Sequence, residues 1–152
     1  MATDTLMYRY SKLQADGRTP VQVFKSMTGT KKFLLESTYT HEKKGKYSFL
    51  GMDPFGEVIG RDGETTIIDH VFEKAETKRM NALDYLKNHL PFIETDLPVP
   101  FFGGAVGYVG YDAIRDFLKI GEPLKDDLQL PTIHFMLFKD VIVLTIQMTR
   151  FI

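Results

Sequence analysis

The stretch from Phe101 to Tyr111 (FFGGAVGYVGY) constrains the fold more than any other part of the sequence. Valine and tyrosine separate its later glycines, and these residue types favour a strand over a helix. Glycines inside a strand mark a bulge or the close approach of another backbone. The second half of this stretch is therefore predicted to be a buried strand.

The same glycines could be taken for a phosphate-binding loop. A dinucleotide fingerprint needs its glycines to open a helix directly after a strand, and a Walker loop needs a following Gly-Lys-Ser/Thr. The residues between Gly104 and Gly110 favour strand, and no Gly-Lys-Ser/Thr follows. A structural strand is preferred to phosphate binding.

The rest of the chain alternates a few helical segments with more numerous strands. Thr19 and Pro20 predict a helix start, with Gly29 as its end. Asn81 to Leu90 is the clearest helix, and a short helix is expected over 112–118. Strands are predicted at Lys31 to Ser37, at Tyr47 to Met52, in a hairpin over 57–69 that turns at Asp62-Gly63, and in two strands over 133–148 joined at Lys139-Asp140. The expected fold class is α+β, a mainly antiparallel β-sheet with a few packed helices.

Composition excludes several classes of function. The net charge of -1 gives no reason to expect a nucleic-acid or membrane partner, and no apolar run is long enough to cross a bilayer. Without cysteine there is no disulfide, thiolate metal site or thiol nucleophile. The start of the chain lacks the basic and apolar regions of a signal peptide, so a cytoplasmic, cofactor-free domain is expected.

The four histidines, His41, His70, His89 and His134, stand far apart in the sequence. None is in a helical pair or at metal-ligand spacing from a carboxylate, so each is expected to be a surface or core histidine. No catalytic residues and no metal ligands are predicted for this chain.

Leu34-Leu35-Glu36-Ser37 allows two interpretations. In one, a strand leaves the core, with Glu36 exposed and Ser37 starting a turn. In the other, Glu36 is the counter-ion of a ligand ammonium and Ser37 a hydrogen-bond partner. Because neighbouring side chains in a strand point to opposite faces, both can touch one ligand only where the strand ends or bulges.

Several blocks together resemble a known family. Thr19-Pro20-Val21, Phe33 to Ser37 (FLLES), Gly45 to Gly51 (GKYSFLG) with Pro54, and Pro100 to Asp112 (PFFGGAVGYVGYD) resemble the N-terminal region of anthranilate synthase component I, the large subunit. The resemblance divides the chain into an N-terminal extension of the same domain (1–18), the family domain (19–143) and a tail that does not match the family (144–152).

The resemblance implies a function that the residues alone do not indicate. The family's large subunit, a lyase of tryptophan biosynthesis, converts chorismate to anthranilate with ammonia from a glutamine amidotransferase subunit, and it needs Mg²⁺. The chorismate and metal ligands belong to a C-terminal catalytic domain outside these 152 residues, so this chain alone is expected to be inactive. The Leu-Leu-Glu-Ser segment implies an allosteric feedback site for L-tryptophan. Its residues would be Leu35, Glu36, Ser37, Lys46, Tyr47 and Ser48.

The sequence departs from the family at Lys46, where arginine is usual. Lysine keeps the charge but loses the planar fork of hydrogen-bond donors. Two alternatives stay open. One is the N-terminal domain of aminodeoxychorismate synthase component I, a relative that more often has Asp at position 36. The other is a free-standing amino-acid-binding or interaction domain, which would have a closed polar surface. A domain that packs against a catalytic partner would instead have an uncovered apolar face.

Overall fold

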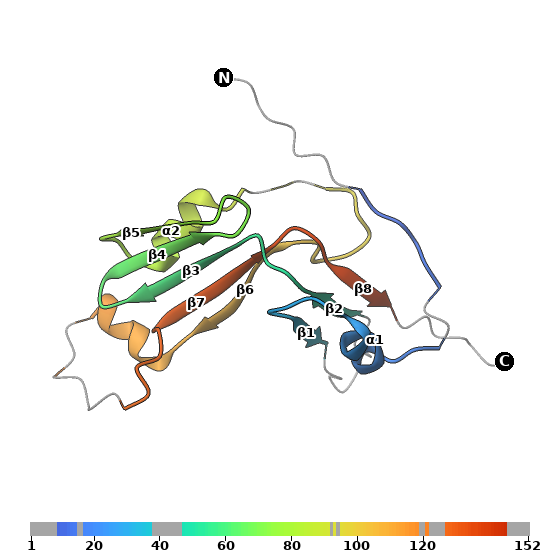
Figure 1. The fold of residues 1–152 in the computed structure, drawn as a ribbon, viewed down its shortest axis with the longest axis horizontal. Helices are drawn as coiled ribbons and strands as arrows, with labels where there is room; N and C mark the ends of the chain where they lie inside the picture. The colour runs from blue at the N-terminus through green and yellow to red at the C-terminus, as the bar shows by residue number, and fades with distance from the viewer. Residues whose placement is uncertain are drawn as a thin grey trace, which may run out of the picture.

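The computed structural model describes residues 9–14, 17–37, 47–91, 93, 95–118, 121 and 127–145. These residues form two α-helices, one 3-10 helix and eight strands (Figure 1). In chain order they are α1 (Pro20–Ser26), β1 (Phe33–Glu36), β2 (Tyr47–Gly51), β3 (Gly56–Arg61), β4 (Glu64–Asp69), β5 (Lys74–Lys78), α2 (Ala82–His89), β6 (Gly104–Val109), η1 (Tyr111–Asp116), β7 (Ile133–Phe138) and β8 (Ile142–Thr145).

The strands form two antiparallel sheets. The smaller has the order β1-β2-β8 and the larger the order β5-β4-β3-β7-β6, and every pairing in the described part of the chain is antiparallel. The predicted α+β class is confirmed. Lys139 and Asp140 do connect two strands, but these strands are not a hairpin, because β7 pairs with β3 and β8 pairs with β2.

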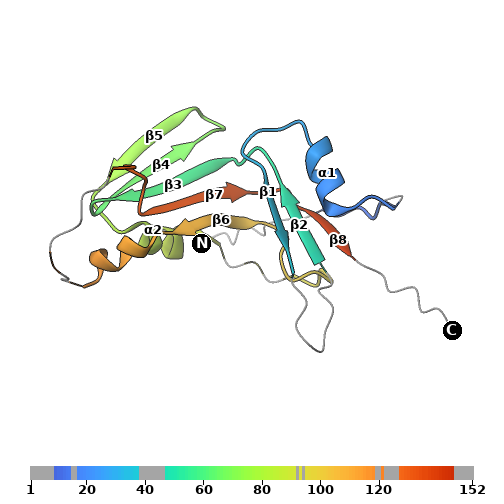
Figure 2. The ribbon, with the colours of Figure 1, turned by 90° about the horizontal axis from the view of Figure 1, so that it is seen from below.

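Two connections join the sheets. The chain passes from β2 into β3 and from β7 into β8, so the smaller sheet lies at one end of the larger (Figure 2). The apolar segments on either side of Lys139-Asp140 therefore belong to two different sheets.

The helix starts follow the predicted capping chemistry. Thr19 and Gln22 form a capping box, in which each side chain bonds to the other residue's backbone N–H. Helix α1 ends at Ser26, before the predicted Gly29. The side chain of Asn81 accepts a hydrogen bond from the Leu83 N–H at 2.8 Å, which satisfies one of the free donors at the start of α2.

The predicted turn at Asp62-Gly63 is confirmed. Both residues have positive φ, 50° and 73°, as a tight two-residue hairpin requires. The next strand, β5, was not predicted, because its sequence KAETK has no apolar alternation and all of it is exposed.

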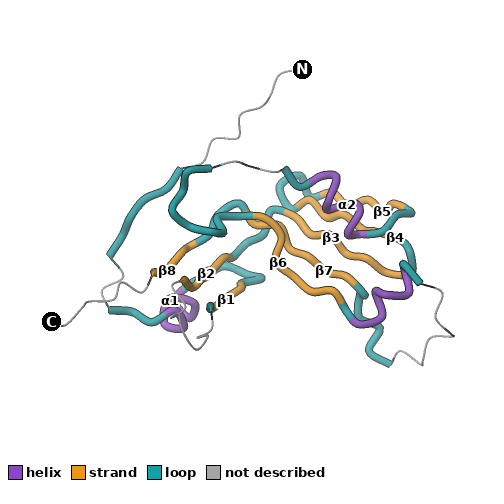
Figure 3. The backbone as a smooth tube through the Cα atoms, turned by 180° about the vertical axis from the view of Figure 1, so that it is seen from behind, coloured by secondary structure: helices purple, strands orange, loops and turns teal. Residues whose placement is uncertain are grey.

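Within the described residues, helices cover one face of the larger sheet. Val58 and Ile133 on this face pack with Ala82 and Leu86 of α2 and with Ala113 of η1 to form the core. Figure 3 shows α2 lying on this side of the sheet. The opposite face, here called the open face, carries the alternate residues of β3, β4, β6 and β7. They are Glu57, Ile59, Thr66, Ile68, Val106, Tyr108, His134 and Met136.

Strand β6 makes the close approach expected from the sequence, but it is not the buried strand that was predicted, because it lies at the edge of the larger sheet and Gly107 to Val109 are exposed. A Cβ atom on Gly107 would lie 2.6 Å from the Cα of Phe135 and 2.8 Å from the carbonyl carbon of His134. Neither backbone atom can move without disturbing the β6–β7 pairing, so position 107 admits only glycine.

Gly107→Ala is expected to lower the free energy of unfolding by about 3 kcal/mol, because overpacking against backbone cannot be relieved by a rotamer change. Urea denaturation monitored by circular dichroism measures this. Gly121→Ala is the control, since a Cβ there meets nothing within 4 Å. Equal stability of the two variants would contradict the close packing of β6 on β7.

Candidate functional site

The residues predicted to bind an amino acid lie where β1 and β2 pair. Leu35 and Glu36 end β1, and Tyr47 and Ser48 begin β2. Ser37 continues the register opposite Tyr47, and both its N–H and its hydroxyl donate to the Tyr47 carbonyl at 3.1 Å. Lys46 lies outside the described residues.

The register separates these residues onto two faces of the smaller sheet. Leu35 is opposite Phe49, so Leu35 shares one face with Ser37, Tyr47 and Phe49. We call these four residues the aromatic face. The Tyr47 and Phe49 rings stack with centroids 5.9 Å apart, and Phe101 meets Phe49 edge-on at 5.7 Å. Leu35 is 46% exposed at the edge of this cluster.

Glu36 and Ser48 lie on the other face, directly opposite each other. Glu36 is exposed, whereas Ser48 is only 5% exposed. The structure therefore brings Leu35, Ser37 and Tyr47 together and turns the side chains of Glu36 and Ser48 away from them. Glu36 is the last residue of β1, but Ser37 continues its register, so the two side chains still point to opposite faces.

A groove of about 1770 Å³ runs beside β2 and β8, and Tyr47 and Ser48 are among its lining residues. Leu35, Glu36 and Ser37 are not. Its floor includes the buried Leu50 and Phe138, and Arg9, Lys12 and Arg18 contribute positive charge to its wall. The groove is several times larger than a single amino acid, so it does not by itself define an amino-acid pocket.

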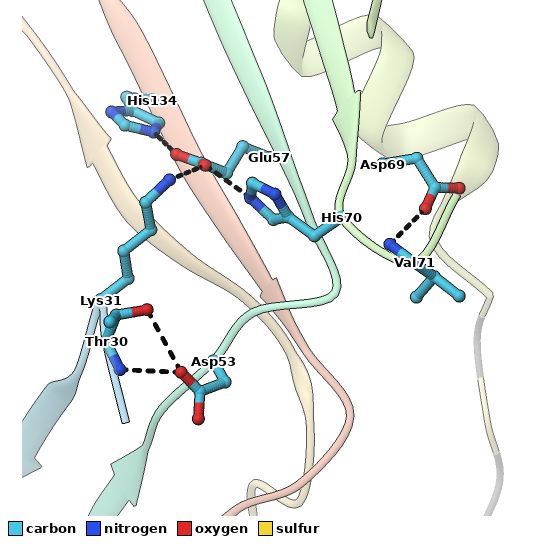
Figure 4. Close-up of polar contacts among 8 residues, drawn as sticks. All are labelled: Thr30, Lys31, Asp53, Glu57, Asp69, His70, Val71 and His134. Carbon is cyan, nitrogen blue, oxygen red and sulfur yellow. Dashed lines mark hydrogen bonds and ion pairs between the residues drawn. The ribbon is translucent and has the colours of Figure 1, made fainter. Parts of the chain in front are cut away.

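A polar cluster on the larger sheet was not predicted from the sequence. Glu57 on β3 has a side chain only 3% exposed, and it binds the ammonium group of Lys31. The Nε2 atoms of His70 and His134 lie 2.7 Å from its Oε1 and Oε2 respectively (Figure 4). We call these four residues the Glu57 cluster. The first and last of them, Lys31 and His134, are 103 positions apart in the chain. The β3–β7 pairing brings His134 to Glu57, the β3–β4 pairing brings His70, and the Thr30–Asp53 bonds hold the segment of Lys31 beside them.

The surroundings of Glu57 hold it in the ionised form. Burial raises the pKa of the Glu57 carboxyl, but hydrogen bonds from Lys31, His134 and His70 lower it by more, and the net pKa falls from 4.5 to about 2. The ionised carboxylate only accepts hydrogen bonds, so the two imidazole Nε2 atoms carry the donating protons.

A second set of contacts fixes the backbone before Lys31. The Asp53 carboxylate accepts from the Thr30 N–H at 2.7 Å and from its hydroxyl at 3.2 Å, and the Asp53 N–H donates to the Thr30 carbonyl at 2.9 Å. Lys31 itself has φ of 46°, an unfavourable conformation for a residue with a side chain. These bonds therefore hold Lys31 in a strained conformation that directs its ammonium to Glu57 (Figure 4).

The other histidines take no part in this cluster. His89 stacks on Tyr85 in α2 with centroids 4.0 Å apart, and His41 lies outside the described residues. Within the residues that the structure describes, no group of three or more His, Cys, Asp or Glu side chains is arranged to hold a metal ion. None of the helices in that part of the chain is long and apolar enough to span a membrane.

The fold places the chain in a class: an α+β domain with two antiparallel sheets, like part of a solved anthranilate synthase component I. The structure of that protein from Streptococcus pneumoniae superposes with a TM-score of 0.56 over 91% of this chain and 29% of that one, at 24% identity. At this identity the likeness establishes the fold alone.

The sequence comparisons identify the relatives. The chain is 36% identical over 87% of its length to anthranilate synthase component 1 of Acetivibrio thermocellus, and 27% identical over 90% to that of Lactococcus lactis. It is also 32% identical over 81% of its length to aminodeoxychorismate synthase component 1 of Bacillus subtilis. The resemblance to anthranilate synthase component I is confirmed, and the chain is homologous to a segment of these proteins.

The match covers only part of each relative. The chain spans 30%, 27% and 26% of the Lactococcus, Acetivibrio and Bacillus proteins. No family model matches the chain.

The low pKa of Glu57 predicts a specific pH dependence. Because the folded pKa of about 2 lies below the ordinary 4.5, the cluster's stabilisation is complete above about pH 4.5 and is lost as the pH falls towards 2. Glu57→Gln should therefore remove up to about 3 kcal/mol of stability at pH 6 and much less at pH 2.5. Urea unfolding at both pH values measures the difference.

Glu76→Gln on β5 is the matched control, since its side chain is 58% exposed. This variant should differ little from the unmodified chain at either pH. A Glu57→Gln deficit that stays constant from pH 6 to pH 2.5 would show that Glu57 is not held ionised by the cluster.

Proposed function

We propose that the chain is the N-terminal regulatory domain of anthranilate synthase component I and carries part of the feedback site for L-tryptophan. The observation that carries this proposal is similarity to component 1 proteins over most of the chain, including the β1–β2 pair with Leu35, Ser37 and Tyr47 on one face. The whole protein would convert chorismate to anthranilate with ammonia from its glutamine amidotransferase subunit.

Catalysis is assigned to the remainder of the longer protein. The Mg²⁺ of the parent enzyme has no fitting set of ligands among the described residues, so no magnesium site is assigned to them. The role of this domain in the reaction is then regulatory. We expect the chain alone to bind inhibitor weakly and to leave chorismate unchanged.

The aromatic face suits the side chain of tryptophan. An indole ring could pack on Leu35 beside the Tyr47–Phe49 stack, where aromatic pairs add to the free energy of burial. The Ser37 hydroxyl is the polar group of this face and would orient the ligand. Glu36, at the strand end, would meet the ligand ammonium from the rim. Ser48 and Lys46 have a weaker basis, because Ser48 is buried on the opposite face and Lys46 lies outside the described residues.

The open face of the larger sheet suits the second partner, the catalytic domain of the same polypeptide. Ile59, Ile68, Val106 and Met136 are half-buried there, and Tyr108 is 42% exposed. A free-standing module would instead have a closed polar surface. Bound tryptophan would favour an arrangement of the two domains that turns over chorismate poorly, which is a coupling between separate sites.

Aminodeoxychorismate synthase component 1 remains the second candidate for the parent protein. The 32% identity to the Bacillus subtilis protein supports it directly. Glu36 favours anthranilate synthase over this alternative, since the relative more often has Asp there. The response to tryptophan separates the two, because the feedback proposal requires a site selective for that amino acid.

L-Tryptophan is expected to shift the amide NMR signals of Leu35, Ser37 and Tyr47 selectively, even at weak affinity. D-Tryptophan and L-phenylalanine test selectivity. Ser37→Ala should weaken binding about 3- to 10-fold, the effect of losing one hydrogen bond. Ser26→Ala is the matched control, because its hydroxyl also donates to a backbone carbonyl, that of Val23, on a different element.

The same variants apply to the full-length enzyme. Ser37→Ala or Glu36→Ala should relieve inhibition by tryptophan and spare turnover of chorismate. Unchanged inhibition in both variants would remove these residues from the site. Tryptophan without effect on either the chain or the full-length enzyme would reject the feedback proposal and favour the aminodeoxychorismate alternative.

The half-buried apolar residues of the open face predict self-association of the chain when the catalytic domain is absent. Sedimentation velocity should show an average mass that rises with concentration, and Met136→Lys on the open face should reduce it. Val21→Lys, on α1 at a residue 44% exposed, is the control and should not. A chain that stays monomeric at all concentrations would count against docking through the open face.

A further inference from the structure

The Glu57 cluster has no role in the proposed function, yet it connects the two surfaces that this function uses. Lys31 belongs to the segment that leads into β1, whose far end carries Leu35 and Ser37. Glu57 and His134 lie on the open face of the larger sheet. The ion pair therefore joins the strand that carries the candidate ligand site to the surface proposed to face the catalytic domain.

We propose that the Lys31–Glu57 ion pair, with His70 and His134, couples the position of β1 to the hydrogen bonding of side chains on the open face of the five-stranded sheet. This inference rests on the proposed function for the identity of the ligand, but not for the existence of the coupling.

Strand β1 can shift along β2 as a unit. In the described part of the chain it is an edge strand of four residues that pairs with β2. Ser37 is joined to Tyr47 at one end, and Thr30 is joined to Asp53 at the other. The strand is nearly inextensible along its length, so a displacement at Ser37 reaches Lys31 about 20 Å away.

Lys31 is held in a backbone conformation that can relax. Its φ of 46° is unfavourable, and the three hydrogen bonds between Thr30 and Asp53 maintain it. A small shift of β1 that weakens these bonds favours the relaxed backbone, in which the ammonium leaves Glu57. Lys31 is 45% exposed, so its ammonium can return to water at little cost.

Loss of the Lys31 ammonium leaves the Glu57 carboxylate without its cationic partner. Its side chain is 3% exposed, and without Lys31 its negative charge has the two imidazoles as its remaining partners in the cluster. A buried charge without a counter-ion is strongly unfavourable, so the hydrogen bonds from the two imidazoles to Glu57 must rearrange. This rearrangement alters hydrogen-bonding groups at the open face, where His134 lies beside the Tyr108 ring with centroids 6.1 Å apart.

A ligand-free experiment on the full 152-residue chain tests the coupling directly. Ser37→Ala disturbs the far end of β1, and the probe is the side-chain ¹⁵N chemical shift of His70 and His134. Ser37→Ala should change these chemical shifts. In the Lys31→Met background, Ser37→Ala should leave them unchanged. Lys74→Met on β5 is the control for Lys31→Met, since Lys74 is exposed and outside the cluster. In this background the histidine shifts should still respond to Ser37→Ala. The proposal would be overturned if Ser37→Ala left the histidine chemical shifts unchanged, or if it still changed them in the Lys31→Met background.

A titration with tryptophan is the second part of the experiment. If it binds near Leu35 and Ser37, it should shift the same histidine signals, and Lys31→Met should change its affinity about fivefold while abolishing the remote shifts. Local shifts at Ser37 with no histidine response would overturn the coupling and leave the binding proposal intact. A complete lack of binding would reject the feedback site, and the ligand-free arm would still decide whether the coupling exists.

Discussion

In the middle of the larger sheet β3 hydrogen-bonds to β7, and each strand leads into a strand of the smaller sheet. This pairing sets the register of Val58 and Ile133 over α2 and of Glu57 near His134 on the opposite side. It also directs β2 and β8 to one another, because β2 precedes β3 and β8 follows β7. The core, the polar cluster and the ligand-site strands therefore depend on one antiparallel contact between distant parts of the chain.

Local chemistry in the sequence was enough to predict much of the fold. Two helix starts and one turn depend on only a few neighbouring residues, and each lies where it was expected. They are the starts at Thr19-Pro20 and Asn81 and the turn at Asp62-Gly63. The sequence could not predict how the elements divide between two sheets, because a strand's alternation does not say which partner it pairs with. The charged strand β5 gave no periodic signal, since its one pairing partner is β4 and its residues are all exposed.

The candidate sites show the same limit. The resemblance indicated the β1–β2 region, and the register then separated Leu35 and Ser37 from Glu36, which a sequence motif alone cannot do. The Glu57 cluster was missed because Lys31, Glu57, His70 and His134 have no common motif or spacing. One signal was present: a glutamate inside the apolar segment GEVIG must be paired if that segment is a buried strand.

Strand β5 has a consequence for how the larger sheet can grow. A sheet edge presents unpaired N–H and C=O groups, which invite further strands and aggregation. At this edge the charged residues Lys74, Glu76 and Lys78 lie on one side of the strand. A second copy of β5 that paired here would bring its own charged side chains next to them. The edge formed by β6 has valine, tyrosine and glycine instead. Addition of a strand is therefore less favourable at the β5 edge of the described sheet than at the β6 edge.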